Sequence, residues 1–334
     1  MKLRTNILVL FVVMMQSVVA QDLHYSQYNY SPLNMGGVAT TLMDADFRVA
    51  ANNRKQWNSV TVPYQTFSIG AEEKLKYFGE KFENFTGGLL INQDKAGDGA
   101  FRTLNCYFSI AYQYQLSKDS NSWIAVSVSP GFTQKSIDFN KLTFDKQYIG
   151  DLFNPMAPTG ENPDNTNLSY FDAGGSILFH QIKEQQHFYA IYQIRHINRA
   201  QQNFYSAFTY KQAVHHQVVI GDIIQSSNGL TYLPSMSFSK QNKFVEVVFG
   251  SEVILPSSNK NQSIVGGLHY RVKDAIIPSV ALNYNKFRIG FSYDINLSSL
   301  RTASNRRGGA EISIIYQTLQ IKAQPQRKTI CPIY

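Results

Sequence analysis

The chain has 334 residues, of which 43% are hydrophobic, 13% aromatic and only 16% charged. In ordinary soluble domains about a quarter of the residues are charged. Beyond residue 20 no apolar run approaches the ~20 residues of a membrane-spanning helix, which excludes a helical bundle in a bilayer. The 22 Phe and 20 Tyr argue against disorder. Two cysteines are too few for a small fold stabilised mainly by disulfides, which excludes that class.

The first twenty residues predict export. Lys2 and Arg4 precede an apolar stretch over 7–15, and Val18-Val19-Ala20 suits signal peptidase. We expect a signal peptide over 1–20; a membrane anchor helix is less favoured, because the apolar core is short and no second basic flank follows. Loss of the two basic residues lowers the formal net charge from +8 to +6. This modest excess argues against nucleic acid as a partner.

Alternation of apolar and polar side chains dominates the mature chain. Between residues 104 and 116 apolar side chains occupy one parity, and most of the other parity is polar. Successive side chains of a strand point to opposite faces, so this pattern predicts a strand with one apolar face. Strands of a soluble sandwich also alternate, but they average five or six residues, and several strands predicted here reach ten or more.

The same pattern predicts fourteen strands. Their mean length of about ten residues, at ~3.4 Å per residue and a tilt of ~45°, covers the ~25 Å apolar band of an outer-membrane barrel. An even count is typical of single-chain bacterial barrels. The predicted strands are 47–53, 66–74, 84–92, 104–116, 123–135, 171–180, 188–197, 213–222, 230–240, 243–254, 264–271, 275–284, 287–294 and 311–318.

The fold class is therefore predicted to be all-β, a transmembrane antiparallel β-barrel of about 14 strands over 47–318. A periplasmic or lumenal segment over 21–46 would precede it, and a periplasmic tail over 319–334 would follow. Long and short connections alternate, with the longest over 136–170. Barrels have long outer loops and short periplasmic turns, which predicts that both termini are periplasmic.

Charged residues on the polar parity are expected to face the lumen, because facing lipid would be costly. Their mixed signs suggest ion pairs across a filled interior rather than an ion-selective pore. These residues are Asp172, Arg195, Glu246, Glu252, Arg288 and Asp294.

The sequence contains no motif that predicts a catalytic, metal or cofactor site. The seven histidines never have the i, i+4 spacing of a helical metal site. His215 and His216 are adjacent in a strand and point to opposite faces. Gly174-Gly175-Ser176 lacks the spacing of a nucleophile elbow. The acidic and amide residues over 164–167 lack a full calcium pattern, so a solvated turn is favoured.

An ordered set of motifs resembles the PorP/SprF family along the whole mature chain. The start, Gln21-Asp22-Leu23-His24-Tyr25-Ser26-Gln27-Tyr28, resembles the family's Q-D-x-x-(F/Y)-S-Q opening. Asn53-Arg54-Lys55-Gln56-Trp57 is similar to the family's R-x-Q-W, Pro63-Tyr64-Gln65-Thr66 to P-x-Q-T, and Asn92-Gln93-Asp94-Lys95-Ala96-Gly97 to N-x-D-x-x-G. Further along the chain, Gly290-Phe291-Ser292-Tyr293-Asp294-Ile295 is similar to G-Y-S-Y-D-I, Glu311-Ile312 to a late glutamate, and Cys331-Pro332-Ile333-Tyr334 to a C-P-x-(F/Y) terminus. Asn34-Met35-Gly36-Gly37 departs from the family's usual N-P-A followed by a glycine.

The resemblance implies an outer-membrane component of the type IX secretion system of a Gram-negative bacterium of the Bacteroidetes kind. Members are typically paired with a large secreted surface protein, often an adhesin used in gliding or attachment, which they help to secrete or anchor. The family is not known as an enzyme and implies no cofactor. Its expected partners are the C-terminal signal domain of that cargo, other secretion components and outer-membrane lipid.

Four motif residues are predicted to bind a partner: Arg54, Gln56, Trp57 and Asp94. A structural role is the open alternative, with Trp57 in an aromatic girdle and Arg54 bracing neighbouring loops with Asp94. Loop 136–170 is expected to meet the cargo, and the tail over 322–334 to contact periplasmic machinery or close the inner mouth. The alternative function is an outer-membrane diffusion channel or hydrophobic-solute transporter, as many barrels are.

Overall fold

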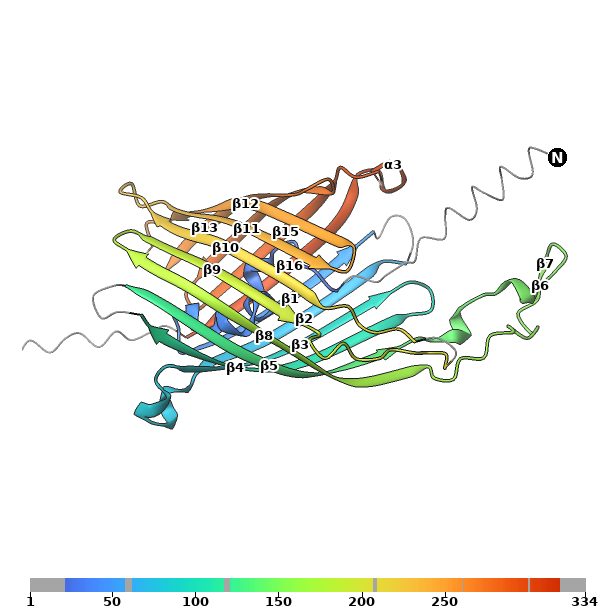
Figure 1. Cartoon of the computed structure of the whole chain (residues 1–334). Helices are drawn as coiled ribbons and strands as arrows, with labels where there is room; N and C mark the ends of the chain where they lie inside the picture. The colour runs from blue at the N-terminus through green and yellow to red at the C-terminus, as the bar shows by residue number, and fades with distance from the viewer. Residues whose placement is uncertain are drawn as a thin grey trace, which may run out of the picture.

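Fourteen antiparallel strands close into a barrel, which confirms the predicted fold class (Figure 1). The computed structural model describes residues 22–57, 62–116, 121–206, 209–259, 261–299 and 301–318. Strand β1 (Phe47–Gln56) pairs with β16 (Arg307–Gln317) and with β2, so no edge is left open. The predicted signal peptide and C-terminal tail lie outside the described residues. None of the described helices is long and apolar enough to cross a bilayer.

Each predicted strand is present, and most extend further than predicted. β8 reaches 17 residues, whereas ten were predicted. The remaining barrel strands are β2 (Tyr64–Lys74), β3 (Phe85–Ala96), β4 (Phe101–Gln115), β5 (Ser122–Ser136), β8 (Asn167–Lys183), β9 (Gln186–Arg195), β10 (His215–Gln225), β11 (Thr231–Gln241), β12 (Phe244–Pro256), β13 (Gln262–Arg271), β14 (Ala275–Tyr284) and β15 (Phe287–Asn296).

The barrel wall has an apolar outer face and a buried inner face. In β4, Phe108 and Tyr114 are 50% and 55% exposed, whereas the inward Ser109 and Ala111 are 4% and 1% exposed. This is the alternation that the sequence predicts. Lipid would cover the outer side chains, which explains large apolar residues at positions open to solvent in the isolated chain.

The two ends of the barrel differ in their connections. One end, which we call the long-loop end, carries the connections over 137–166 and 196–214. At the other, the short-turn end, the longest connection is the ten-residue stretch over 75–84. The longest loop also contains a small hairpin of β6 (Tyr148–Ile149) and β7 (Leu152–Phe153), visible far from the barrel in Figure 1. Strands of two residues leave no detectable alternation in the sequence.

Residues 22–46, here called the lumenal segment, run inside the barrel before β1 begins (Figure 1). The segment contains η1 (Tyr28–Tyr30), α2 (Pro32–Met35) and η2 (Gly37–Leu42). Gly37 is required by close packing, because a Cβ there would lie 2.8 Å from the Ser127 hydroxyl oxygen. The segment thus lies directly against the barrel wall.

The lumenal segment crosses the lumen from end to end. Asp22 contacts His196, just beyond β9, at the long-loop end. At the short-turn end the amide of Thr318 donates to the Phe47 carbonyl at 3.0 Å. The described chain therefore begins and finishes at opposite ends of the barrel, which differs from the expected shared side for the termini. Which end faces the periplasm stays a prediction.

Apolar packing holds the middle of the lumenal segment. Val38 and Ala39 are 0% and 1% exposed and cluster with Leu178, Ile191 and Val219 from three strands. Each fully buried aliphatic side chain contributes about 1.5–3 kcal/mol relative to exposure. The lumen is therefore filled at its centre by side chains of the protein itself.

The lipid-facing assignment predicts the effect of a charge on the outer wall. Val128 is 65% exposed near the middle of β5. Val128→Lys should lower the free energy of unfolding by about 2–4 kcal/mol, because a lysine near the bilayer midplane is poorly solvated. Urea titration of the barrel in lipid vesicles measures this loss. Thr143→Lys, in the longest loop, is the control and should change stability by less than about 0.5 kcal/mol.

Candidate functional site

A cavity of about 550 Å³ opens at the long-loop end above the lumenal segment. All four residues predicted to bind a partner, Arg54, Gln56, Trp57 and Asp94, contribute to its lining. The first described residues, over 22–24, also line it. Spatial convergence of the four residues agrees with a common site, while partner binding by them stays a prediction.

An ionic cluster lies beside this cavity, formed by the buried residues Arg54, Arg271 and Asp294 and the half-buried Glu246. Both guanidinium groups reach one Asp294 oxygen, Arg54 at 2.8 Å and Arg271 at 3.0 Å. The Arg271 Nε lies 3.4 Å from a Glu246 oxygen. A carboxylate held by two guanidinium groups has its charge well compensated in spite of burial. Asp294 is therefore the ion-pair partner of Arg54, while the bracing role suggested for Arg54 together with Asp94 stays a prediction.

The ionic cluster also holds the lumenal segment. The Arg54 Nη1 donates to the His24 carbonyl at 3.1 Å, and the Ser26 hydroxyl donates to Asp294 at 2.6 Å. The Ser26 amide donates to a Glu311 carboxylate oxygen at 2.7 Å. Residues of the opening, R-x-Q-W, G-Y-S-Y-D-I and late-glutamate motifs thus meet in one place. Their shared task is to attach the lumenal segment to the wall.

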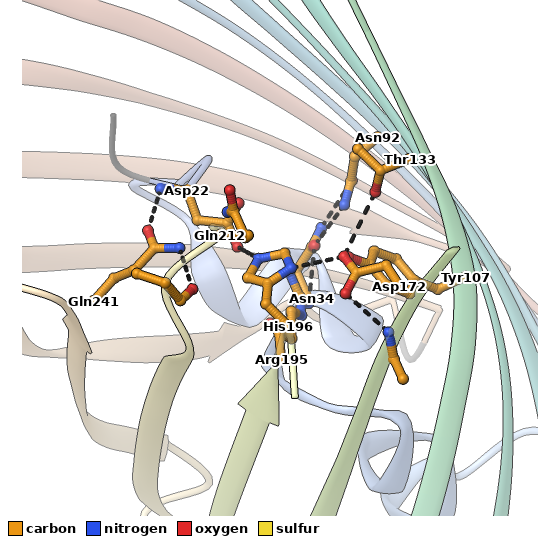
Figure 2. A network of polar contacts seen from close by, with 12 residues as sticks. Asp22, Asn34, Asn92, Tyr107, Thr133, Asp172, Arg195, His196, Gln212 and Gln241 are labelled. Atoms are coloured by element: carbon orange, nitrogen blue, oxygen red, sulfur yellow. Dashed lines mark hydrogen bonds and ion pairs between the residues drawn. The ribbon is translucent and has the colours of Figure 1, made fainter. Parts of the chain in front are cut away.

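A second network fixes the start of the lumenal segment through His196 (Figure 2). The His196 Nε2 lies 2.9 Å from an Asp22 oxygen, and Nδ1 lies 2.6 Å from an Asp172 oxygen. The Tyr107 hydroxyl donates to the same Asp172 oxygen at 2.5 Å. The Asp22 amide donates to the Gln241 side chain at 2.7 Å. Two carboxylates on one imidazole favour its doubly protonated form.

This arrangement shifts the pKa of His196. Burial by itself would lower it, but the charge of Asp22 and the hydrogen bonds to Asp172 and Asp22 outweigh burial and raise the pKa of His196 to about 9. The imidazolium is then the main species at neutral pH. Asp22 and Asp172 are held apart by a cation placed between them.

Four of the six predicted lumenal charges are buried, Glu246 and Arg288 are half-buried, and only some of the six form ion pairs. Asp172, Glu246 and Asp294 pair with cations as described above. Arg195 instead donates to the Asn34 main-chain carbonyl at 3.0 Å. Glu252 accepts from the Tyr30 hydroxyl at 3.4 Å, and Arg288 donates to the Asn283 side chain at 2.6 Å. The lumenal segment provides polar atoms that replace some opposite charges.

Three of the predicted residues face the cavity without belonging to the ionic cluster. Asp94 accepts a hydrogen bond from the Thr66 hydroxyl at 2.6 Å, and within the described chain it has no ion pair. Trp57 directly follows β1 with a positive φ of 59° and packs edge-on against Tyr64, with 5.2 Å between ring centroids. Gln56, the last residue of β1, also lines the cavity.

Sequence reasoning missed His196, Arg271 and the role of Glu311 at this site. His196 was considered only for metal binding, and its two aspartates are 24 and 174 residues away along the chain. No spacing signal could have connected them. Within the described residues, no group of three or more His, Cys, Asp or Glu is placed to hold a metal ion.

A closed 14-strand barrel with an apolar outer face and a filled lumen defines the class of outer-membrane β-barrel proteins. The family described as type IX secretion system membrane protein PorP/SprF matches residues 17–316. The chain belongs to this family, as the sequence motifs indicated, and its location is the outer membrane.

Comparison with solved structures shows the same fold at low sequence identity. The toluene transporter TodX of Pseudomonas putida is similar with a TM-score of 0.50 and 8% identity, covering 89% of this chain and 95% of TodX. The CymD monoaromatic hydrocarbon channel is similar with a TM-score of 0.48 and 10% identity, covering 86% of this chain and 93% of CymD. No curated protein sequence matches the chain.

The ionic cluster predicts that Arg54 is structural as well as cavity-lining. Arg54→Gln should lower the free energy of unfolding by about 3 kcal/mol, because it removes one of two cations from buried Asp294. Lys55→Gln, one residue along the same strand at an exposed position, is the control. Urea unfolding in vesicles distinguishes the two variants, and equal stability would contradict the role assigned to Arg54.

The His196 network predicts that attachment of the lumenal segment depends on pH. A pKa raised to about 9 stabilises attachment fully below about pH 6.5 and loses this contribution as pH rises through 9. A spin label at Leu23→Cys, in a background free of other cysteines, should be immobile at pH 6.5 and mobile above pH 9.5. His196→Gln should remove the transition, and unchanged mobility of the parent protein over this range would refute the prediction.

Proposed function

We propose that this protein anchors a large secreted surface protein, often an adhesin, in the outer membrane and assists its secretion by binding its C-terminal signal domain. The observation that carries the proposal is the filled lumen: the lumenal segment packs against the barrel wall through Val38 and Ala39. A barrel occupied in this way has its free surface at its ends. Partners are therefore expected at the loops rather than in transit through the barrel.

The long-loop end offers a braced surface for this partner. The base of loop 137–166 is joined to loop 196–214 by a hydrogen bond from the Tyr205 hydroxyl to Glu161 at 2.8 Å and one from the Asn165 amide to the Phe204 carbonyl at 3.2 Å. Preorganised loops lose less conformational entropy on binding. The cavity with Gln56, Trp57 and Asp94 lies at the same end and supplies the second contact.

The remaining partners follow from the family. Other type IX secretion components are expected at the short-turn end, which we propose faces the periplasm together with the C-terminal tail. In this orientation loop 137–166 projects from the cell. Gliding or attachment would then depend on how firmly the surface protein is held.

Retention of the surface protein tests the proposal. Deletion of this protein should move most of the large surface protein from the cell surface into the medium or leave it unexported, because its anchor is lost. Quantitative immunoblotting of cells and medium measures this shift. Trp57→Ala and Asp94→Asn should fold normally but weaken retention, whereas the exposed Lys95→Gln is the control.

Planar bilayers separate this function from the alternative. The purified barrel should give no steady conductance, because the lumenal segment occupies its interior. A lasting conductance, or uptake of hydrophobic solutes that is lost on deletion, together with unchanged retention of the surface protein, would favour a channel or transporter and overturn the proposal.

A further inference from the structure

The hairpin in loop 137–166 bears the most unusual surface outside the lipid-facing wall. Five large apolar side chains are solvent-exposed within nine residues of chain, and Figure 1 shows their hairpin away from the barrel strands that lipid would surround. Leu152 and Met156 reach 77% and 91% exposure. We call this set the hairpin tip: Tyr148, Ile149, Leu152, Phe153 and Met156.

The hairpin tip is apolar on both faces. Tyr148 pairs with Phe153 across the two strands, with 5.3 Å between their rings, and Ile149 pairs with Leu152. Successive residues of a strand point to opposite faces, so one pair lies on each face. A hairpin that only covers its own protein would need one apolar face. Two apolar faces fit an element that inserts between the walls of a groove.

The hairpin has a defined base despite its exposure. Gln147 is 6% exposed, and its main-chain carbonyl accepts from the Asn154 amide at 2.8 Å. Its side-chain oxygen accepts from the Phe144 amide at 3.0 Å. Gln147 thus connects both limbs of the hairpin, through its main-chain carbonyl and its side chain.

The net charge of loop 137–166 is opposite in sign to the net charge of the whole chain. Residues 137–166 contain five carboxylates and two lysines, a net charge of −3, whereas the whole chain carries +8. Asp145, Lys146 and Asp151 are exposed beside the apolar residues, which leaves a net negative charge there, and Asp151 lies in the turn between β6 and β7. An element that inserts into lipid is typically rich in Lys and Arg on its polar face. The acidic border instead complements a basic protein surface.

We infer that the hairpin tip is the insertion element for the secreted partner, and that it enters an apolar groove bordered by Lys and Arg on that partner's C-terminal domain. This inference rests on the proposed function and names the chemistry of the partner surface. Apolar contacts at the tip would provide most of the affinity, and Asp145 and Asp151 would accelerate association. Figure 1 shows the hairpin beyond the end of the barrel, where a bulky exported domain can approach it.

Binding measurements on the full chain test the inference. The probe is the purified C-terminal domain of the surface protein that the wild-type barrel retains, and the barrel is reconstituted in nanodiscs. Ile149→Ser with Leu152→Ser should weaken binding at least tenfold, because two central apolar contacts are lost. Phe78→Ser is the matched control, since Phe78 is 72% exposed but lies at the short-turn end, and its Kd should stay within twofold of wild type.

The rate of association tests the proposed role of the two aspartates. Asp145→Asn with Asp151→Asn should slow association several-fold with little change in dissociation, and the difference from wild type should shrink as salt increases. An association rate that these two substitutions leave unchanged at low salt would contradict the proposed border of Lys and Arg around the partner's groove.

Failure of the proposed function can be distinguished from failure of the inference about the hairpin tip. If the wild-type barrel does not bind the domain, the proposed function fails. If the wild type binds and the Ile149→Ser, Leu152→Ser variant binds equally well, only the insertion role of the hairpin tip fails. Loss of binding of this variant to protein-free lipid vesicles, with unchanged binding to the domain, would assign the tip to lipid and overturn the inference. Heat modifiability on gels verifies that each variant is folded.

Discussion

The structure depends on one constraint, the lack of hydrogen-bonding water inside a bilayer. Each backbone amide and carbonyl in the hydrocarbon region must find a partner within the protein, and a closed sheet provides one for all of them. The pairing of β1 with β16 over Arg48–Gln56 and Gly309–Gln317 closes the barrel and removes its last open edge. The long strands and the apolar outer face follow from the same constraint.

Closure creates an interior that the chain fills with residues 22–46. The lumenal segment brings apolar side chains to the centre and main-chain groups to the charged residues near the long-loop end. Arg54, Arg271 and Asp294 compensate one another, and the same groups hold His24 and Ser26. The barrel and its contents therefore form one folded unit. This leaves the loops and the mouth cavity as surfaces for partners.

Much of the wall could be predicted from residue order, whereas the interior could not. Alternation over 104–116 is local, because it reflects the side-chain direction of a single strand, and it predicted β4 correctly. Pairing of Arg54 with Asp294 spans 240 residues and depends on which strands meet across the lumen. For this reason the sequence did not indicate Asp294 as the partner of Arg54. The sequence did not connect His196 with its two aspartates, because neither of them is near it along the chain.

The sequence by itself determined the class, the fourteen strands, their inward and outward faces and the family, because period-two alternation and ordered motifs are properties of residue order. Only the tertiary structure decided that residues 22–46 run through the lumen and that the described chain starts at the long-loop end. It also decided which distant motif residues touch. These features depend on barrel closure and on packing between strands far apart in the chain, and such contacts have no local periodicity.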